Sequence, residues 1–336
     1  MSYGLQLAGI RVLGGVDSDE ACQQTYEANV RGAAFVRAGV ETLGPSSLAR
    51  RVGISVDDDA LLFVGCTPCQ FWSKIRTAKD KAVKTAFLLK SFARFVRHFR
   101  PGFVVVENVP GLLVNKSQSP LPSFVSVLQR CGYACAEGVV NANRYGVPQN
   151  RMRYVLLASR LVSTIELPPG DTDHGPVVRS VIGAEHGFKR LSAGQQDPDD
   201  NLHVAARLSD RNLMRIRITP HSGGTRLSWS DNPLLQIPAY EGRDQVFRDV
   251  YGRMWWDRPA PTITTRFNSL SNGRFGHPDE DRAISLREGA ALQTFPRTFV
   301  FQGPDQATIA RQIGNAVPPE LARRIGEHVR RVRDRA

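Results

Sequence analysis

Two cysteines stand three positions apart in the stretch VGCTPCQFWS, residues 64–73. This spacing occurs in redox enzymes and in half of a zinc site, but one cysteine of such a pair can also act alone as a nucleophile. Zinc is disfavoured because Cys131 and Cys135 have a looser spacing and no pair of histidines stands beside them. Redox chemistry stays open as a weaker alternative, and we interpret Cys66 as a small buried residue.

Cys69 gains interest from polar residues that border apolar runs elsewhere in the chain. Glu107 and Asn108 end the run FVVVEN, and QNRMR supplies Gln149 and two arginines before the run RYVLLAS. Each motif has an ordinary alternative, because the glutamate could cap a helix and the arginines could form a surface pair. Near the C-terminus, QIGNAVPP could be a turn that leads into a helix.

Strands and helices alternate over residues 57–160, and this alternation would position those side chains. We predict strands over residues 61–64, 103–109, 134–140 and 153–159, and helices over residues 85–99 and 123–130. Uniformly apolar strands that alternate with helices indicate an α/β sheet covered on both faces. The loops after the carboxyl ends of such strands carry the functional site, and Cys69 and Glu107 are both predicted there.

The composition excludes several classes of protein and favours one kind of partner. No stretch of the 336 residues approaches the ~18 apolar residues of a membrane span, and the N-terminus lacks the features of a secretory signal. Five cysteines fit a reducing cytosol better than a disulfide scaffold. The net charge of +12 favours a polyanionic partner, most simply nucleic acid, although a protein that happens to be basic remains the alternative.

The character of the chain changes after about Leu167. Glycine, proline, aspartate and serine become frequent, the apolar stretches become short, and helical patterns return only from Ser285. A solvated irregular domain with surface ion pairs is one interpretation, and a second, basic domain is the other. The arginines that support the second interpretation are Arg207, Arg211, Arg215, Arg217 and Arg226.

Taken together and in this order, the motifs resemble those of the DNA cytosine-5 methyltransferase family. The resemblance runs from about Tyr3 to Val329, with the central arginine-rich part as the exception. It implies an α/β fold, with the Rossmann-like mixed sheet of S-adenosylmethionine-dependent methyltransferases and a smaller, irregular target-recognition domain. The matched segments are PCQxxS (68–73), ENV (107–109), QxRxR (149–153), RPAPTIT (258–264), HPDEDRAISLREGAALQTFP (277–296) and GNAVPP (314–319).

The resemblance implies methyl transfer to carbon 5 of cytosine through a covalent intermediate. Cys69 would add to carbon 6, which makes carbon 5 nucleophilic and divides one difficult step into two. Glu107 would share a proton with N3 of the ring, and Arg153, supported by Arg151, would hold O2 and compensate charge.

The resemblance also implies S-adenosylmethionine as the methyl donor, with no metal. Asp17, at the end of an expected strand, would hold the ribose hydroxyls, with an N-cap as the alternative role. Ser18 would face the adenine. The other matched donor-site positions are Pro68, Leu88, Asn315 and Val317.

Double-stranded DNA is the implied partner, and the target cytosine must be flipped out of the duplex to reach such a pocket. Residues 178–247 would recognise the target sequence through arginines that bind phosphates or guanine edges. The residues that we expect to contact DNA are Gln70, Ser73, Asn108, Gln149, Thr262, Arg215 and Arg217.

We therefore expect three parts of the chain, which are a catalytic domain (1–175), a target-recognition domain (176–275) and a segment that returns to the catalytic domain (276–336). The expected setting is the cytoplasm of a bacterium. The protein would be a monomer that protects DNA from a cognate restriction endonuclease.

Two departures from the family pattern qualify this expectation. The glycine-rich loop that follows the family's first strand has no counterpart before Ser2, and Gly39 stands where an acidic residue usually holds the adenine amine, unless Glu41 substitutes for it. We expect a start codon upstream of Met1, and an inactive DNA-binding remnant is the alternative. A tRNA-modifying branch of the family is a weaker third hypothesis.

Overall fold

The computed structural model describes residues 1–66, 80–114, 119–170, 175–242 and 246–336, without the side chains of residues 80–87 and 114. The chain forms two compact units, which we describe separately. The first unit comprises Met1–Asn141, Met152–Gly170 and Leu321–Ala336, and the second comprises Ala142–Arg151 and Asp171–Glu320.

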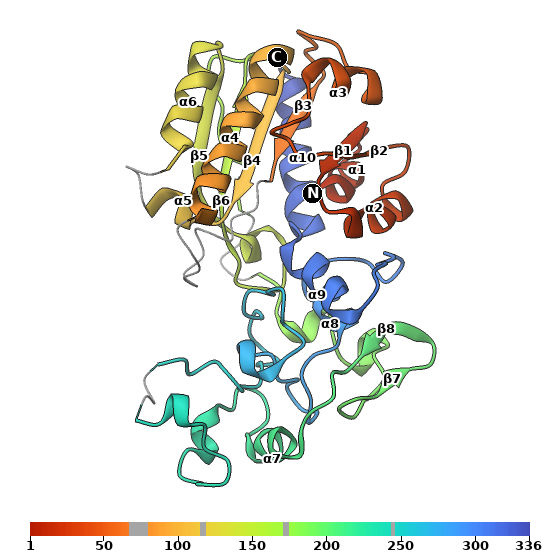
Figure 1. The fold of residues 1–336 in the computed structure, drawn as a ribbon, viewed down its shortest axis with the longest axis vertical. Coiled ribbons are helices and arrows are strands. Elements are labelled where there is room, and N and C mark those ends of the chain that lie inside the picture. Colours follow the sequence, from red (N-terminus) through yellow and green to blue (C-terminus); the bar gives the residue numbers. More distant parts are fainter. Residues whose placement is uncertain (67–79, 115–118, 171–174, 243–245) are drawn as a thin grey trace. The chain divides into compact units, whose positions relative to one another are not determined.

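A four-stranded mixed sheet organises the first unit (Figure 1). Its strands lie in the order β3-β4-β6-β5, with β3 parallel to β4, and β6 antiparallel to both β4 and β5. These strands are β3 (Leu62–Gly65), β4 (Phe103–Asn108), β5 (Ala134–Asn141) and β6 (Met152–Ser159). Each of the four strands predicted from the sequence is therefore present, and the mixed sheet is the one expected.

Helices α4 (Asp80–Phe99) and α6 (Leu121–Arg130) pack side by side against this sheet, as Figure 1 shows. Phe92 and Val96 of α4 and Phe124 of α6 share one core cluster with Val104 of β4 and Leu156 of β6. All six residues of β4 are buried, so both faces of the sheet are covered at this strand, as predicted. The end of β4 is thereby held rigidly for the polar residues that stand there.

A separate parallel pair, β1 (Gly14–Asp17) and β2 (Ala34–Arg37), completes the strands of the first unit. Among the described residues, β1 and β3 each have a hydrogen-bonded neighbour on one side only. Leu62 and Val64 of β3 nevertheless pack against the apolar cluster of Leu5, Val12 and Val30. The remaining helices here are α1 (Ser2–Leu7), α2 (Gln23–Asn29), α3 (Pro45–Val52), α5 (Gly111–Val114) and the greater part of α10 (Pro319–Arg333).

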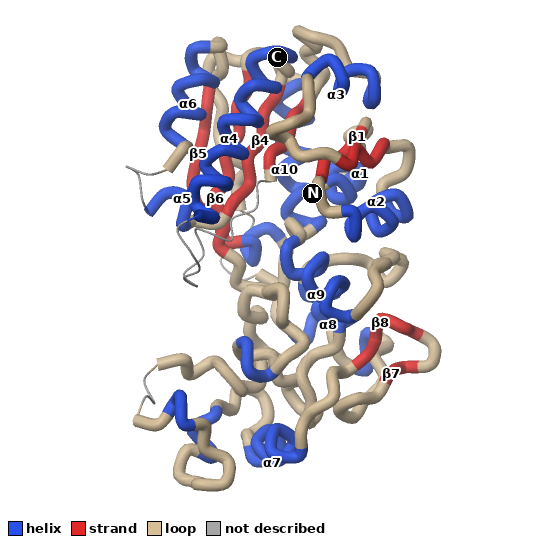
Figure 2. The backbone as a smooth tube through the Cα atoms, in the orientation of Figure 1, coloured by secondary structure: helices blue, strands red, loops and turns tan. Residues whose placement is uncertain are grey.

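Loops make up most of the second unit, as Figure 2 shows. Its strands are the short antiparallel pair β7 (Gln196–Asp197) and β8 (Asp200–Val204). Its α-helices are α7 (Asp210–Ile218), α8 (Leu286–Leu292) and α9 (Gln306–Asn315). Single 3-10 turns of three or four residues occur in both units, at 20–22, 142–145, 178–180, 184–186, 226–229, 238–240 and 270–272.

The second unit extends further along the sequence than the segment expected for target recognition. We expected a return to the catalytic domain at residue 276, whereas the first unit resumes only at Leu321. The physical reason is that α8 and α9 share a core with the central segment: Leu286, Leu292 and Ile313 cluster with Val178 and Met254.

A buried ion pair fixes the start of α8. Arg282 and Glu288, both fully buried, form a two-pronged interaction with distances of 2.7 and 2.8 Å, and Ser285 caps the helix. Burial alone would raise the pKa of the Glu288 carboxyl, but the Arg282 guanidinium outweighs burial and holds this pKa well below its ordinary value. Glu288 is therefore ionised in the folded protein even in mild acid.

We expect Glu288→Gln to lower the free energy of unfolding at pH 7 by about 3 kcal/mol, because the buried Arg282 loses its two-pronged counter-charge and keeps Glu280, 2.9 Å from its Nε, as a carboxylate partner. Because folding lowers the pKa of Glu288, its carboxylate stabilises the fold at pH values above 4.5, the pKa in the unfolded chain. This stabilisation is lost progressively as the pH falls below 4.5. The stability difference between wild type and variant should therefore shrink by about 1.4 kcal/mol between pH 7 and pH 3.5. Thermal unfolding at both pH values measures it, with the exposed Glu185→Gln as control. An equal difference at both pH values would argue against the ion pair.

Candidate active site

Glu107 and Arg153 form an ion pair at the end of β4. They lie diagonally across the antiparallel β4–β6 pair, where Glu107 is opposite Val155, and Arg153 Nε is 2.9 Å from Glu107 Oε1. Both side chains are largely buried, with exposed fractions of 8 and 12 %. The sheet register thus brings together two predicted catalytic residues that are 46 positions apart in the sequence.

The loop with the predicted nucleophile begins beside this pair. Strands β3 and β4 are parallel with Gly65 opposite Val106, so residue 66 follows β3 at the edge of the sheet where Glu107 lies. Pro68, Cys69, Gln70 and Ser73 lie outside the described residues.

The other four cysteines, all within the described residues, form no disulfide bond. The prediction that Cys66 is buried is wrong: it is exposed, because it comes directly after the last residue of β3. Burial, with a smaller effect of Glu137, raises the pKa of Cys135 to about 11, so this thiol is protonated at neutral pH. Since the thiolate is the nucleophilic form, Cys135 is a poor candidate for covalent chemistry.

Arg151 and Gln149 join three of the predicted motifs within the second unit. Arg151 is 2 % exposed and donates hydrogen bonds to the carbonyls of Ile263, Gly314 and Ala316 at 2.8–3.0 Å. Gln149 is fully buried, and its Oε1 accepts from Ile263 N at 3.1 Å. The segments 149–151, 262–264 and 314–316 therefore hold one another in place.

The sequence did not single out a second glutamine that belongs to this junction. Gln293, fully buried in the segment LQTFP, accepts a hydrogen bond from Gln149 Nε2 and donates one to Ile313 O, at 2.8 and 2.6 Å. Its only signal in the sequence was its place inside the segment 277–296 that matches the family. Glycine is required at 314, because a Cβ there would lie 2.3 Å from Thr264 O.

We expect Arg151→Ala to lower the free energy of unfolding by about 3 kcal/mol, because three buried carbonyls lose a charged donor. Chemical denaturation of the second unit measures this loss. The matched control is Arg211→Ala, whose exposed side chain should cost less than about 0.5 kcal/mol. A loss for Arg151→Ala no larger than for the control would contradict the structural role.

The predicted DNA contacts divide into exposed and buried residues. Thr262 is half-buried, and its hydroxyl donates to Asn150 O at 2.7 Å. Asn108 is 2 % exposed and accepts a hydrogen bond from Val109 N, and Gln149 is buried as described above. Arg217 is exposed, with Asp281 Oδ2 3.9 Å from its Nε.

Arg215 is placed where DNA does not reach its guanidinium. It is buried against Trp229 and Tyr251, and it donates to the carbonyls of Leu235 and Gln236 at 2.7 and 3.1 Å. The prediction that Arg215 contacts DNA is therefore corrected: this side chain holds the 226–251 segment on α7. Arg217 points to solvent because residues two positions apart on a helix lie on different sides of it.

Asp17 and Ser18, two of the predicted donor-site residues, lie at the end of β1, and Gly39 and Glu41 follow the end of β2. Asp17 ends β1 opposite Arg37, is exposed, and accepts a hydrogen bond from Asp19 N; Ser18 beside it is also exposed. The carboxylate of Glu41 folds back over Gly39, 2.9 Å from where a Cβ would stand. Two carboxylates thus flank the carboxyl ends of adjacent parallel strands.

The remaining donor-site predictions lie on helices or next to them. Leu88 is half-buried on α4, in the first unit. In the second unit, Asn315 is the exposed last residue of α9, and Val317 is 5 % exposed.

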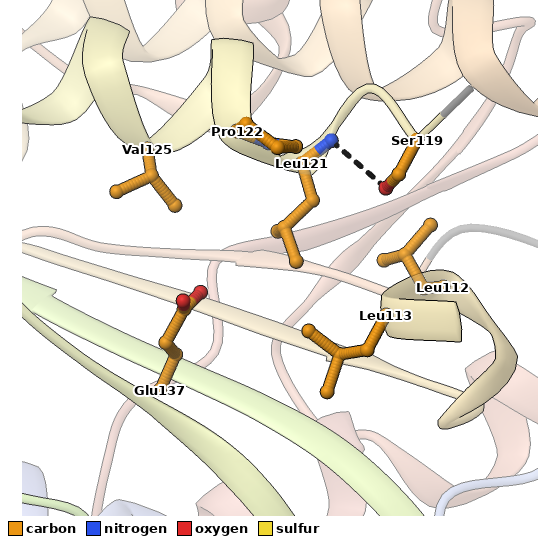
Figure 3. A pocket seen from close by; sticks show the side chains of 7 residues that line it. All are labelled: Leu112, Leu113, Ser119, Leu121, Pro122, Val125 and Glu137. Carbon is orange, nitrogen blue, oxygen red and sulfur yellow. Dashed lines mark hydrogen bonds between the residues drawn. The ribbon is translucent and has the colours of Figure 1, made fainter. Parts of the chain in front are cut away.

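An apolar recess of about 330 Å³ lies elsewhere in the first unit, between α5, α6 and β5 (Figure 3). Leu112, Leu121 and Val125 line it, and the carboxylate of Glu137 points into it while accepting from Tyr154 Oη. The predicted site residues that the structure describes do not line this recess, so it is separate from the ion pair of Glu107 and Arg153.

Comparison with known proteins assigns the family. A model of the C-5 cytosine-specific DNA methylases matches residues 1–331, and the chain belongs to this family. It is a DNA (cytosine-5-)-methyltransferase (EC 2.1.1.37), an enzyme class that uses S-adenosylmethionine as the methyl donor. Because the match begins at residue 1, the truncation expected from the sequence is not shown.

Individual relatives agree with this assignment. The chain is 38 % identical over 337 residues to the type II methylase M.HgiDII of Herpetosiphon aurantiacus, covering 98 % of this chain and 92 % of the relative. It is 32 % identical to the type II methyltransferase M1.HphI of Haemophilus parahaemolyticus, covering 98 and 83 %.

Solved structures share the fold. A prophage-encoded E. coli protein described as a DNA modification methyltransferase has a TM-score of 0.73 and 20 % identity, covering 98 % of this chain and 95 % of that one. The S. pombe Dnmt2 methyltransferase has a TM-score of 0.63 and 16 % identity, covering 99 and 94 %. Over the described residues, no helix combines the length and apolar character needed to cross a membrane.

Proposed function

We propose that this enzyme methylates a flipped-out cytosine of a specific duplex DNA sequence through a covalent adduct of Cys69. The observation that carries the proposal is the buried pair of Glu107 and Arg153 at the end of β4, beside the loop that contains Cys69. This pair supplies an acid and a cation at one place, which a ring that gains electron density requires.

Covalent addition is the role of the thiolate. Cys69 Sγ forms a bond with carbon 6 of the cytosine, and the electron pair of the 5,6 double bond moves toward the ring nitrogen N3. Glu107 shares a proton with N3 and so stabilises this charge, while Arg153, whose Nε is 2.9 Å from Glu107 Oε1, fixes the orientation of the carboxyl. Once carbon 5 has accepted the methyl group, it loses its proton, the N3 proton returns to Glu107 and the thiolate leaves, which restores the aromatic ring.

Carboxylates at the ends of β1 and β2 fit the methyl donor. Bound S-adenosylmethionine supplies the electrophilic methyl group that carbon 5 accepts. Asp17, exposed at the end of β1, would hold the ribose hydroxyls. Glu41 lies over Gly39 and offers the acid that the sequence lacks at that position, with its oxygens available to the adenine amine.

The segments 149–151, 262–264 and 314–316, which hydrogen-bond to one another in the second unit, support a role in DNA binding. Thr262 lies in the segment that Arg151 and Gln149 hold rigid, so its position can be set for a backbone phosphate. Arg217, exposed on α7, would bind a phosphate. The net charge of +12 favours this polyanionic partner.

The biological setting that we propose is a type II restriction-modification system of a bacterium. The relatives M.HgiDII and M1.HphI, which the chain matches over 98 % of its length, are type II enzymes by name. We propose that the enzyme acts as a monomer in the cytoplasm and protects the host DNA from a cognate endonuclease.

Bisulfite sequencing of host DNA tests this function directly. Cells that express the chain should acquire protected cytosines within one short sequence context. Absence of protected cytosines, together with salt-sensitive duplex binding by the purified chain, would instead favour the inactive DNA-binding remnant.

A further inference from the structure

A loop of the second unit, residues 219–225 with the sequence TPHSGGT, has no role in the chemistry described above. It follows α7, and its residues His221 and Ser222 are exposed. Buried residues from three other segments hold its backbone, which is unusual for a surface loop. The structure thus gives this loop a fixed shape at the surface.

Two buried arginines bind the carbonyls of the 219–225 loop. Arg253 is fully buried, and its Nε donates to Thr219 O at 2.9 Å while its backbone N donates to Gly224 O at 3.0 Å. Arg274 is 4 % exposed, and its Nη1 donates to the carbonyls of Gly223 and Gly224 at 2.9 and 3.1 Å. Burying a guanidinium costs free energy unless it is hydrogen-bonded, and the carbonyls of this loop supply part of those hydrogen bonds. The two arginines therefore fix the position of the loop.

The backbone of the loop is strained where it turns. Ser222 has φ of 43°, a region that residues other than glycine, asparagine and aspartate seldom adopt, and Gly223 has φ of 107°. A Cβ on Gly223 would lie 1.9 Å from Trp255 Nε1, so only glycine fits against this indole. Ser222 is also held on both sides, because its N donates to Pro278 O and its Oγ accepts from Trp256 N. Strain that the surroundings maintain occurs preferentially at functional sites.

His221 stands at the exposed tip of this loop. Over the described parts of the chain, its imidazole has no hydrogen-bond partner, although both ring nitrogens are able to form hydrogen bonds. Pro220 before it and the anchored Ser222 after it limit its backbone freedom, so little entropy is lost when the side chain binds.

A cation accompanies the loop. The Arg258 guanidinium lies 4.7 Å from the centre of the Trp255 ring, the same ring against which Gly223 packs. Arg258 is exposed, and no carboxylate within the described residues forms an ion pair with it. A rigid polar tip on a loop that packs against the same indole as an exposed guanidinium fits a base contact accompanied by a phosphate contact.

We propose that His221 is a specificity-determining residue, which donates a hydrogen bond to a base edge of the target sequence, and that Arg258 binds a neighbouring phosphate. This inference rests on the proposed function, since it names the part of the second unit that recognises the DNA sequence. Arg253, Arg274 and Trp255 are positioning residues that hold the loop in its strained form.

Methylation of a pool of duplexes that differ at single positions of the target, read by bisulfite sequencing, tests the proposal. His221→Ala should reduce discrimination about tenfold at one position of the target and leave the other positions unchanged. Arg258→Ala should weaken binding to every duplex alike and reduce the slope of log affinity against log salt by about one. Gly223→Ala should relax the same position as His221→Ala, because it displaces the loop from Trp255.

His98→Ala, an exposed histidine of α4 in the first unit, is the matched control and should keep the wild-type profile. Circular dichroism and the Tm of each variant establish that it is folded. A wild-type profile for His221→Ala would overturn the proposal, as would equal relaxation at all positions. If the wild-type chain methylates no cytosine in any duplex, the proposed function itself fails, and this outcome is distinct from both.

Discussion

Cys69→Ala is expected to abolish methyl transfer, with a rate reduced at least about 1,000-fold, because the thiolate that activates carbon 5 is lost. Transfer of labelled methyl groups to duplex DNA measures the rate. DNA binding should persist, since binding depends on cations and on the second unit rather than on the thiol.

The other cysteine of the Cys-x-x-Cys pair provides the matched control. Cys66 is exposed and follows β3 directly, but the proposed chemistry assigns it no step. Cys66→Ala should therefore retain activity. If both variants lose activity equally, the two thiols act together and the redox interpretation of the pair returns.

Glu107→Gln is expected to reduce the rate by about 100- to 10,000-fold, the range typical for loss of a general acid. The amide keeps the shape of the carboxyl but cannot hold an exchangeable proton at N3 in the same way. It also leaves Arg153 without its counter-charge at 2.9 Å. The rate of methyl transfer at saturating DNA and donor measures the loss.

Glu137→Gln is the control for this variant. Glu137 lies on β5, accepts a hydrogen bond from Tyr154 and lines the apolar recess rather than the ion pair. A glutamine there retains an acceptor, and we expect wild-type rates. If Glu107→Gln keeps the wild-type rate while folded, Glu107 is not the acid.

The catalytic edge of the sheet was predictable from the sequence because it depends on local patterns. Apolar runs predicted β3, β4 and β6, a less continuous apolar pattern predicted β5, and the observed boundaries differ by at most one residue at either end of each strand. The proximity of Glu107 and Arg153 was harder to predict from the sequence, because it follows from the antiparallel register of β4 and β6. The sequence predicted the start of this helix at residue 85, whereas α4 begins at Asp80. The residues before 85 are mostly polar and lack the helical spacing of apolar residues on which the prediction relied.

The roles of the arginines were the least predictable part. Arg215 and Arg217 are two positions apart in one helix, yet one is buried among carbonyls and the other is exposed. Arg151, which we expect to support catalysis, also donates hydrogen bonds to three carbonyls that are more than 100 positions away. Contacts of this kind depend on which loops pack together, and local sequence patterns carry no information about them.

Covalent capture by duplex DNA with 5-fluorocytosine at the target position tests the central claim most directly. The fluorine cannot leave as the proton does, so the enzyme should remain bonded to the base. We predict a complex that survives denaturation in the presence of S-adenosylmethionine, with the DNA mapped to Cys69 by peptide mass spectrometry. A complex that still forms with Cys69→Ala, or no complex with a wild-type chain that methylates normal DNA, would contradict the account.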